Sequence, residues 1–368
     1  MLYYRQSWLK MENYIPEKKT SPNLPFISII IAARNEEKNI GGCLKSIINQ
    51  TYPQERFEII VTDDHSTDDT ASIVKSFEKT NIVLLQLADF IDKKSLNSYK
   101  KKSIETALKV AKGDLIVTTD ADCIVQTKWL ETIADFYIER QHVFIAMPVS
   151  YSIPENGSFS KRFFYIFQSL DFMTLQGITG ASVSKGFHNM CNGANLAYEK
   201  KDFYAVNGFE GIDEIASGDD MLLMDKIQKA FPDKIGYLKS ADVIVTTNPA
   251  ETVREFLNQR IRWASKADRY TDKKITAVLL LVYLLNAWLF TLAIASFFSM
   301  NALYWLIAGV VVKIIFELLF LFPVARFFKN KKLLWWFIPA QPFHIVYTIV
   351  AGWLGKFGSY RWKGRKVK

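Results

Sequence analysis

The sequence predicts an α/β domain with a largely parallel sheet and flanking helices, followed by transmembrane helices. In the first part of the chain, short β-branched runs alternate with segments of helical spacing, the pattern of a sheet whose strands are joined by helices. From about residue 275, apolar stretches follow that are long enough to cross a bilayer at roughly 20 residues each. The 368 residues are enough for a domain with a substantial core and a separate membrane region.

The first strand is expected at Phe26–Ala32, a run typical of a strand buried on both faces. A helix is expected at Glu36–Ile48, where apolar residues recur at helical spacing, and a second strand at Phe57–Thr62. The alternation continues with a helix at Thr70–Glu78, a strand at Ile82–Leu87, a helix at Ser103–Lys112 and a strand at Leu115–Thr119. Ligands of such sheets bind beyond the carboxyl ends of the strands.

Three apolar stretches follow in the last third of the chain. The first, Thr276–Ser299, is uncharged and predicts a transmembrane helix. The second, Ala302–Ala325, contains Lys313 and Glu317 one helical turn apart. They form either a neutralised pair packed against another helix or the lining of a substrate path.

The third apolar stretch, Leu333–Leu354, contains Pro339 and Pro342 and is expected to be kinked or re-entrant. Basic residues before the first stretch and between the second and third place those ends in the cytoplasm. The basic tail Arg361–Lys368 also favours the cytoplasm, which conflicts with a third full crossing. We therefore expect a multi-pass protein of the inner (plasma) membrane with a cytoplasmic catalytic domain, and leave the number of crossings open.

The composition limits the kinds of partner. The net charge is +9, but much of the basic excess flanks the apolar stretches, at Arg260–Lys274, Arg326–Lys332 and Lys356–Lys368. That placement favours membrane lipid headgroups over nucleic acid. Three cysteines without CxxC spacing indicate neither a disulfide framework nor a zinc site. The first 26 residues lack the apolar run of a signal peptide or spanning helix, and their aromatic residues, Tyr3, Tyr4 and Trp8, suit a membrane interface.

Acidic clusters occur where predicted strands end. In the first cluster, Val61–Thr70, Asp63 and Asp64 lie at the end of a hydrophobic strand, directly before a turn rich in Ser, Thr and Asp. One of the residues at 66–68 is expected to cap the next helix, but capping does not require two carboxylates directly after the strand. We therefore expect Asp64 to contact a ligand.

The second cluster, Thr118–Cys123, has two carboxylates, Asp120 and Asp122, one residue apart after a strand. Such a pair can place hard oxygen ligands around one Mg²⁺ or Mn²⁺ and leave positions for diphosphate oxygens. The DxD spacing alone is a weak signal, and its position after a strand strengthens it.

In the third cluster, Ser217–Met224, Asp219 and Asp220 precede a helix, where either could serve as an N-cap or as a general base. A final motif, Gln259–Trp263, precedes the first apolar stretch. Its arginines suit a diphosphate and its tryptophan a sugar ring, although a membrane interface would favour the same residues.

Taken in order, these motifs resemble the family 2 glycosyltransferases of GT-A fold, particularly the membrane-integrated branch with cellulose, chitin, hyaluronan and poly-N-acetylglucosamine synthases and ceramide glucosyltransferases. The resemblance covers about residues 26–270 and extends into the membrane segments. It rests on SIIIAARNEE (28–37), VTDDHSTDDT (61–70), TTDADC (118–123), CNGAN (191–195), SGDD (217–220) and QRIRW (259–263).

The resemblance implies a nucleotide-sugar donor, a divalent metal and inversion at the anomeric carbon. It assigns Glu36 and Asp64 to the nucleoside, Asp120 and Asp122 to the metal and diphosphate, and Asp220 to the catalytic base. An α-linked donor would give a β-linked product.

The remaining implied contacts concern the diphosphate and the acceptor. Arg262 would meet the diphosphate, and a donor-contacting lysine falls within Lys100–Lys102, of which we select Lys101. The residues implied for the acceptor are Gly193, Asp219, Gln259 and Trp263.

We expect four regions: an interfacial or linker segment at 1–25, a GT-A domain at 26–270, a membrane region at 275–356 with helices near 275–299, 302–325 and 333–355, and a basic tail at 357–368. The expected function is transfer of a hexose or N-acetylhexosamine to a saccharide or lipid-linked acceptor, including polysaccharide synthesis. The alternative is a single transfer to a lipid. A non-catalytic membrane scaffold predicts loss of the carboxylates, and all three clusters are present.

Overall fold

The structure is a computed structural model that describes residues 1–16, 23–77, 81–91, 98–154, 157–215, 217–266 and 272–358, and the backbone of 360–362 and 365–367. It divides into two compact units. An α/β unit comprises Glu12–Ser150 and Asn189–Asn248, and a helical unit comprises Met1–Met11, Tyr151–His188 and Pro249–Lys368. Parts of the expected linker at 1–25, of the basic segment at 260–274 and of the tail at 357–368 lie outside the described residues.

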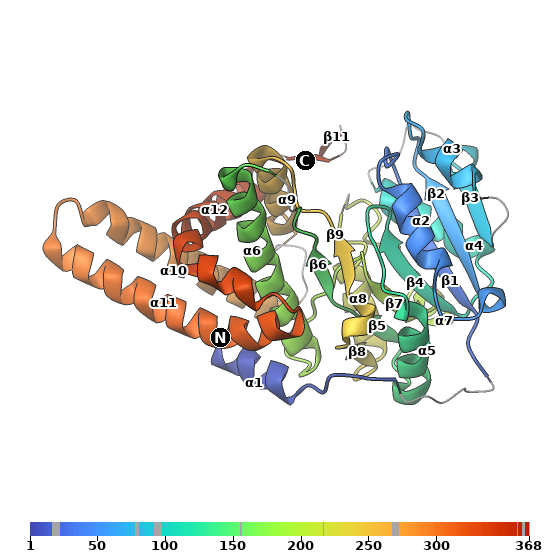
Figure 1. The fold of residues 1–368 in the computed structure, drawn as a ribbon, viewed down its shortest axis with the longest axis horizontal. Helices are drawn as coiled ribbons and strands as arrows, with labels where there is room; N and C mark the ends of the chain where they lie inside the picture. Colours follow the sequence, from blue (N-terminus) through green and yellow to red (C-terminus); the bar gives the residue numbers. More distant parts are fainter. Residues whose placement is uncertain are drawn as a thin grey trace. The chain divides into compact units, whose positions relative to one another are not determined.

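The α/β unit is built on a seven-stranded sheet in the order β3-β2-β1-β4-β7-β5-β8 (Figure 1). The strands are β1 (Ile27–Ala33), β2 (Phe57–Asp63), β3 (Ile82–Gln86), β4 (Leu115–Asp120), β5 (Phe144–Ala146), β7 (Leu196–Glu199) and β8 (Ile235–Tyr237). The first four are mutually parallel, β7 runs antiparallel to β4 and β5, and β5 pairs in parallel with β8. The predicted largely parallel sheet is confirmed, with one strand reversed.

The predicted alternation of strands and helices is also observed. The helices of this unit are α2 (Ile40–Ile48), α3 (Thr70–Lys75), α4 (Tyr99–Val110), α5 (Trp129–Arg140), α7 (Lys200–Ala205) and α8 (Met221–Ala230), with short 3-10 turns η1 (Gln54–Arg56), η2 (Leu87–Asp89) and η3 (Ala241–Val243). β6 (Val149–Tyr151) and β9 (Val245–Thr247) form a separate two-stranded sheet. Every residue of β2 is buried, as its continuous apolar run predicts. The cysteines Cys43, Cys123 and Cys191, which all lie within the described residues, form no disulfide bond.

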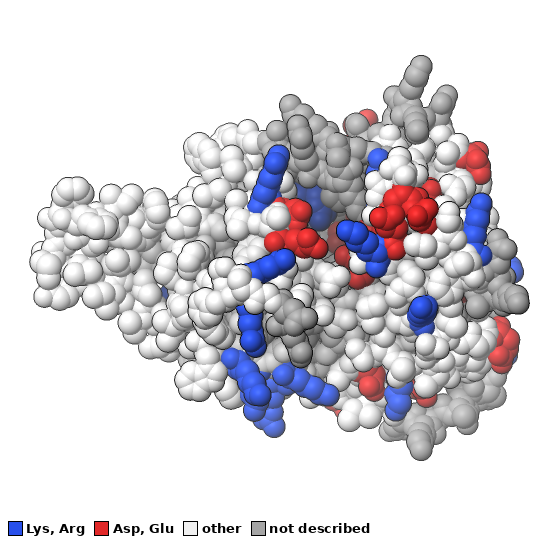
Figure 2. Space-filling view, turned by 45° about the horizontal axis from the view of Figure 1, so that its top comes forward, with Lys and Arg blue, Asp and Glu red and all other residues white. Residues whose placement is uncertain are grey.

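The helical unit contains α1 (Leu2–Lys10), α6 (Phe159–Val183), α9 (Val253–Ala264), α10 (Lys273–Ala295), α11 (Met300–Phe327), η5 (Lys331–Trp336) and α12 (Phe337–Phe357), and ends in the hairpin β10 (Tyr360–Trp362) and β11 (Arg365–Val367). Among the residues that the structure describes, three helices are long and apolar enough to cross a membrane, at 273–295, 300–327 and 331–357, with mean hydropathy of 2.3, 2.4 and 1.3. The part formed by α10 and α11 is almost uniformly uncharged in the space-filling view (Figure 2). The predicted apolar C-terminal helices are therefore present.

The helix α12 is continuous in spite of its two prolines. Pro339 lies in the first turn, where a backbone N–H has no partner within the helix, so its absence is tolerated. Pro342 lies inside the helix and removes one hydrogen bond.

Of the three aromatic residues of α1 that were expected at a membrane interface, two are buried. Trp8 is 1% exposed and contacts Phe327 edge to face, with ring centroids 5.5 Å apart. The Tyr4 hydroxyl lies 2.9 Å from His188 Nε2, and burial lowers the pKa of His188 to about 4, so that a neutral ring meets the hydroxyl. Tyr3 remains exposed. The sequence pattern suggested a membrane interface for all three, whereas two of them pack inside the helical unit.

The charged residues of α11 are neutralised locally. Lys313 Nζ donates to Glu317 Oε2 at 2.8 Å and to Gln341 Oε1 at 2.6 Å, and Gln341 Nε2 donates to Glu317 Oε2 at 3.1 Å. This three-residue cluster corresponds to the neutralised-pair interpretation, with an amide from α12 as the third member.

Candidate active site

The parallel strands β1, β2 and β4 bring two of the acidic clusters to one edge of the sheet. In the register, Ala33 of β1 lies opposite Asp63 of β2, and Ala32 lies opposite Asp120 of β4. The ends of β2 and β4 are therefore two strand spacings apart, which is about 10 Å. The carboxylates that follow these strands face the same region beyond the sheet, as expected for an open α/β fold.

The turns after β1 and β2 are linked to each other. Asn35 and His65 both have positive φ, 51° and 55°, a conformation that few non-glycine residues adopt. Asn35 N donates to Ser66 Oγ at 3.0 Å, and Thr67 N donates to Asn35 Oδ1 at 2.9 Å. Strained turns of this kind persist where surrounding contacts hold them, and here they fix the loop that carries Asp64.

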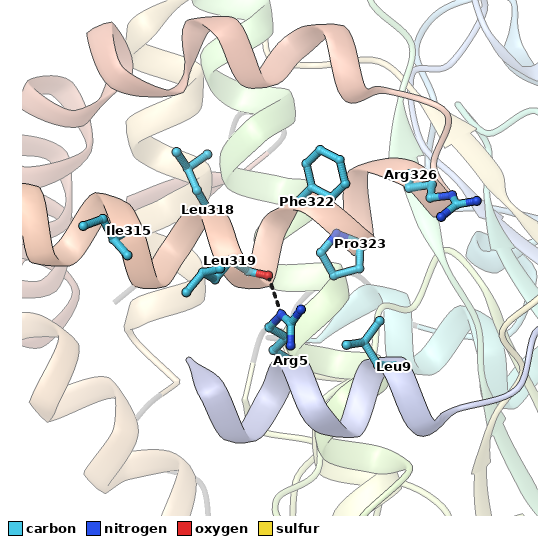
Figure 3. Close-up of a pocket in the computed structure, with 8 residues that line it drawn as sticks. All are labelled: Arg5, Leu9, Ile315, Leu318, Leu319, Phe322, Pro323 and Arg326. Carbon is cyan, nitrogen blue, oxygen red and sulfur yellow. Dashed lines mark hydrogen bonds between the residues drawn. The ribbon is translucent and has the colours of Figure 1, made fainter.

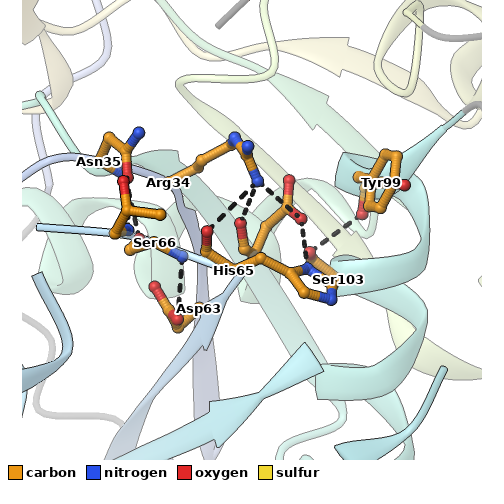
Figure 4. A network of polar contacts seen from close by, with 9 residues as sticks. Arg34, Asn35, Asp63, His65, Ser66, Tyr99 and Ser103 are labelled. Atoms are coloured by element: carbon orange, nitrogen blue, oxygen red, sulfur yellow. Dashed lines mark hydrogen bonds and ion pairs between the residues drawn. The ribbon is translucent and has the colours of Figure 1, made fainter. Parts of the chain in front are cut away.

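Asp64 is 3% exposed and is held by basic groups. Arg34 Nη1 lies 3.6 Å from Asp64 Oδ1 and donates to the Asp64 carbonyl at 2.7 Å, and His65 Nδ1 lies 3.0 Å from Asp64 Oδ1. Figure 4 shows Arg34 directed at the turn that carries His65. Glu36 follows on the adjacent loop, where its Oε2 accepts from Asn39 Nδ2 at 2.8 Å.

The N-cap of α3 is Asp69, one residue beyond the expected 66–68, and its side chain makes no capping hydrogen bond. The neighbouring Asp68 bonds the first residue of the helix instead: its Oδ1 accepts from Thr70 N at 3.1 Å and from Thr70 Oγ1 at 2.6 Å. Asp64 is therefore not needed to cap this helix. Its position beside Arg34 requires another explanation.

Lys100 joins the second and third acidic clusters. Its Nζ lies 2.7 Å from Asp120 Oδ1 and 3.3 Å from Asp219 Oδ2. Although burial opposes the charged form, the two carboxylates prevail and raise the pKa of Lys100 above its ordinary value. The lysine is therefore cationic and holds two carboxylates from distant parts of the chain together.

Lys101, the lysine that we selected from the sequence, lies elsewhere. Its side chain is 2% exposed, and its Nζ donates to the main-chain carbonyls of Ile212, Ile215 and Ser217 at 2.7, 2.5 and 3.2 Å. Successive residues of a helix point about 100° apart, so Lys100 and Lys101 cannot both face the carboxylates. Lys101 supports the loop before the SGDD motif, and Lys100 faces the acidic cluster.

Asp220 is the N-cap of α8 and also contacts the CNGAN loop. Its Oδ1 accepts from Met221 N at 2.7 Å, and its Oδ2 accepts from Gly193 N at 3.0 Å. A Cβ atom on Gly193 would lie 3.2 Å from both Asp219 Oδ2 and Lys100 Nζ, so this position has little room for a side chain. Asp220 therefore caps the helix, which was one of its two predicted roles. The same hydrogen bonds fix its carboxylate beside the cluster of Lys100, Asp120 and Asp219.

Asn195, which the sequence did not single out, anchors the CNGAN loop. Its Nδ2 donates to the carbonyls of Pro148 and Val243 at 2.8 and 2.7 Å, and its Oδ1 accepts from Trp129 Nε1 at 3.0 Å. The side chain is fully buried, so these bonds compensate the loss of hydration of its amide.

The QRIRW motif lies on α9 in the helical unit. Gln259 Oε1 accepts from the Tyr151 hydroxyl at 3.2 Å and from Arg260 Nη1 at 2.9 Å. Arg262 and Trp263 are partly exposed. The guanidinium of Arg260 lies 4.2 Å from the centroid of the Trp263 ring and thereby positions it.

Sequence reasoning missed Asp171, and it placed Arg260 among the motif arginines that suit a diphosphate without anticipating that the two residues pair. Arg260 Nη2 lies 2.7 Å from Asp171 Oδ2, with both side chains at most 5% exposed, and the Tyr347 hydroxyl donates to Asp171 Oδ1. The available signal was an isolated acid within an otherwise apolar segment, because a buried carboxylate requires a cation or donors nearby.

The carboxylates after β4 fit a divalent metal that also binds phosphate. Asp120 ends β4, and Asp122 Oδ2 accepts from Thr247 Oγ1 at 2.9 Å. Among the residues that the structure describes, no group of three or more His, Cys, Asp or Glu side chains is arranged to hold a metal ion by itself. Mg²⁺ is commonly bound by one or two carboxylates together with substrate phosphates, so the donor set of this pair is suitable.

Comparison with known families agrees with this architecture. The chain matches the family models Glycosyl transferase family 2 over residues 28–200 and Glycosyl transferase family group 2 over residues 115–354. The second match covers more than half of the chain. The chain therefore belongs to glycosyl transferase family 2, has the GT-A type of fold and is a glycosyltransferase.

Individual relatives are more distant. Glycosyltransferase AglE from Haloferax volcanii is 27% identical over 242 residues, which are 65% of this chain and 72% of AglE. A Methanococcus voltae protein named dolichyl N-acetyl-alpha-D-glucosaminyl phosphate 3-beta-D-2,3-diacetamido-2,3-dideoxy-beta-D-glucuronosyltransferase is 33% identical over 115 residues, 30% of this chain and 34% of its own length. This chain thus spans about a third of that relative.

A solved structure shares the fold. Mannosyltransferase PcManGT from Pyrobaculum calidifontis, in complex with GDP-Man and Mn²⁺, superimposes with a TM-score of 0.56 at 18% identity, over 96% of this chain and 94% of that one.

Proposed function

We propose that this chain is an inverting glycosyltransferase that transfers a sugar from a nucleoside-diphosphate sugar to a saccharide or lipid-linked acceptor at the cytoplasmic face of a membrane. The observation that carries the proposal is the cluster around Lys100, which joins Asp120 at the end of β4 to Asp219 in the SGDD turn. It lies beyond the carboxyl ends of parallel strands, where such folds bind ligands.

The donor would be held at two places on this edge. Glu36 and Asp64 are assigned to the nucleoside, since both follow the linked turns after β1 and β2. Lys100 is assigned to the diphosphate in place of Lys101, because Lys100 Nζ contacts Asp120 and Asp219 whereas Lys101 Nζ donates to main-chain carbonyls. Arg262 of the QRIRW motif is assigned a second diphosphate contact through its guanidinium.

Asp120 and Asp122 would hold a divalent cation, Mg²⁺ or Mn²⁺. When bound, such an ion stabilises the negative charge that develops on the leaving diphosphate. The complex of PcManGT with Mn²⁺ supports this assignment through the shared fold.

Asp220 is proposed as the general base. Its carboxylate takes the proton of an acceptor hydroxyl, the acceptor oxygen forms a bond to the anomeric carbon, and the bond from that carbon to the diphosphate oxygen breaks. The hydrogen bonds from Gly193 N and Met221 N hold the carboxylate in a fixed orientation for this step. The acceptor contacts are assigned to Gly193, Asp219, Gln259 and Trp263.

A lipid acceptor is the second candidate, and it has its own support. The name of the Methanococcus voltae relative describes transfer to a dolichyl-linked saccharide, and the described part of this chain contains three helices apolar enough for a membrane. We propose that residues 26–270 form the catalytic region and that 275–356 insert into the inner (plasma) membrane in several passes. Polymer formation and single transfer to a lipid remain alternative outcomes of the same chemistry.

The test is a screen of UDP- and GDP-sugars for metal-dependent release of the nucleoside diphosphate by the purified full-length protein. One donor is expected to be turned over in the presence of Mn²⁺ or Mg²⁺ and a membrane extract that supplies acceptor. Product length with labelled donor then distinguishes a polymer from a single addition. Absence of release with every donor, in a protein that binds one of them, would refute the proposed activity.

A further inference from the structure

A cavity of about 450 Å³ lies between the N-terminal helix α1 and the second half of α11, within the helical unit (Figure 3). Its lining includes the apolar side chains of Leu9, Leu319 and Phe322, which are 42–54% exposed. Two arginines, Arg5 and Arg326, complete this part of the lining. The volume lies within the usual range of small-molecule sites.

A proline explains why an arginine lies here. Pro323 has no N–H, so the carbonyl of Leu319, four residues earlier in α11, loses its helical partner. Arg5 Nε donates to that carbonyl at 3.1 Å, across from α1 (Figure 3). This contact uses one of the five guanidinium N–H groups and fixes the arginine beside the cavity.

Among the residues that the structure describes, neither Arg5 nor Arg326 forms an ion pair with a carboxylate. The two positions 319 and 326 are seven residues apart on α11, which is about 10 Å along its axis. Figure 3 shows Arg5 beside Leu319 in the middle of the lining and Arg326 at the last turn of α11. Two arginines that flank part of an apolar cavity are complementary to a phosphate that carries a hydrocarbon chain.

We propose that this cavity binds one anionic phospholipid, with its phosphate between Arg5 and Arg326 and an acyl chain along Ile315, Leu319 and Phe322. Arg326 lies in the last turn of a helix that is apolar enough to span a membrane, where lipid headgroups are expected. The inference rests on the proposed membrane insertion and is independent of the proposed transfer reaction. The lipid would attach the N-terminal helix to α11.

The test is native mass spectrometry of the full-length protein, released from detergent that contains equal amounts of phosphatidylglycerol and phosphatidylcholine with the same acyl chains. We expect one retained phosphatidylglycerol per protein and little phosphatidylcholine. Arg5→Gln and Arg326→Gln are each expected to weaken retention about fivefold, and the double variant about 25-fold. Lys332→Gln is the matched control, because it removes an exposed charge beyond the same end of α11 and does not line the cavity.

A further variant tests whether lipid retention requires the apolar part of the cavity and not only the charge of the two arginines. Ile315→Trp leaves both arginines in place and fills the apolar end of the cavity, so it is expected to abolish retention. Equal retention of both lipids, or retention unchanged in the double arginine variant, would overturn the proposal. Displacement of the lipid by glycerol phosphate alone would also overturn it, since the site would then recognise a free phosphate. Nucleoside diphosphate release, measured on the same samples, reports separately on the transfer reaction.

Discussion

Replacing Asp220 by Asn separates catalysis from capping. Asn keeps the shape and one acceptor oxygen, so it retains one of the two hydrogen bonds from Met221 N and Gly193 N and loses the other. One such bond contributes about 1 kcal/mol to the free energy of unfolding. Loss of a general base lowers the rate about 10²–10⁴-fold, equivalent to about 3–5.5 kcal/mol in the activation free energy.

The two magnitudes make the experiment decisive. Transfer by Asp220→Asn is measured at saturating donor, nucleotide affinity by isothermal titration, and stability by thermal unfolding in detergent. We expect turnover to fall by at least about 10²-fold, with nucleotide affinity nearly unchanged and a small decrease of the unfolding midpoint. Asp272→Asn is the control, because Asp272 also accepts a main-chain hydrogen bond as the N-cap of α10 and is not a proposed site residue. Near-normal turnover in folded Asp220→Asn would refute the assignment and make Asp219 the next candidate.

Four further predictions concern the neighbouring lysines, the metal site, the buried ion pair and the apolar helices. Lys100→Met is expected to weaken nucleotide binding with little effect on stability. Lys101→Met removes the donor shared by three main-chain carbonyls and is expected to destabilise the fold by about 2–3 kcal/mol. Opposite results would reverse the two roles. Mn²⁺ is expected to strengthen nucleotide binding in the unmodified protein but not in Asp122→Ala, and equal affinity with and without metal would reject the metal site. Asp171→Asn or Arg260→Met leaves a buried charge unpaired and is expected to lower stability by about 3–5 kcal/mol, measured by thermal unfolding; an unchanged midpoint would contradict the buried pair. The full chain is expected to require detergent, and a monodisperse sample in plain buffer would contradict membrane insertion.

Local pattern determined the strands that carry the candidate site. The runs predicted at 26–32, 57–62 and 115–119 appear as β1, β2 and β4, each within one residue. Long β-branched runs specify buried strands because few other environments accept them. The strands β2 and β4 end where carboxylates begin, at Asp63 and Asp120. The presence of the apolar C-terminal helices was likewise predicted, since length and hydropathy alone identify them, although α10 ends at Ala295, four residues before the predicted end.

Only the tertiary structure decided which side chains face each other. The sequence offered three consecutive lysines, and the choice of Lys100 over Lys101 depends on the rotational phase of α4, which begins at Tyr99, four residues before the predicted start. A shift of one residue turns a side chain by about 100°, so composition cannot select between neighbours. The burial of Tyr4 and Trp8 likewise depends on partners at 188 and 327, far along the chain.

The ion pair between Arg260 and Asp171 was likewise visible only in the tertiary structure. Asp171 lies on α6 and Arg260 on α9, and no sequence pattern indicates that the two residues are in contact. Motifs can be recognised in the sequence because a reaction requires particular residue types. Strands and membrane-spanning helices can be predicted because they follow from local hydrophobicity. Pairings between distant charges follow from packing, because each buried charge is tolerated only where the fold brings its counterpart within reach.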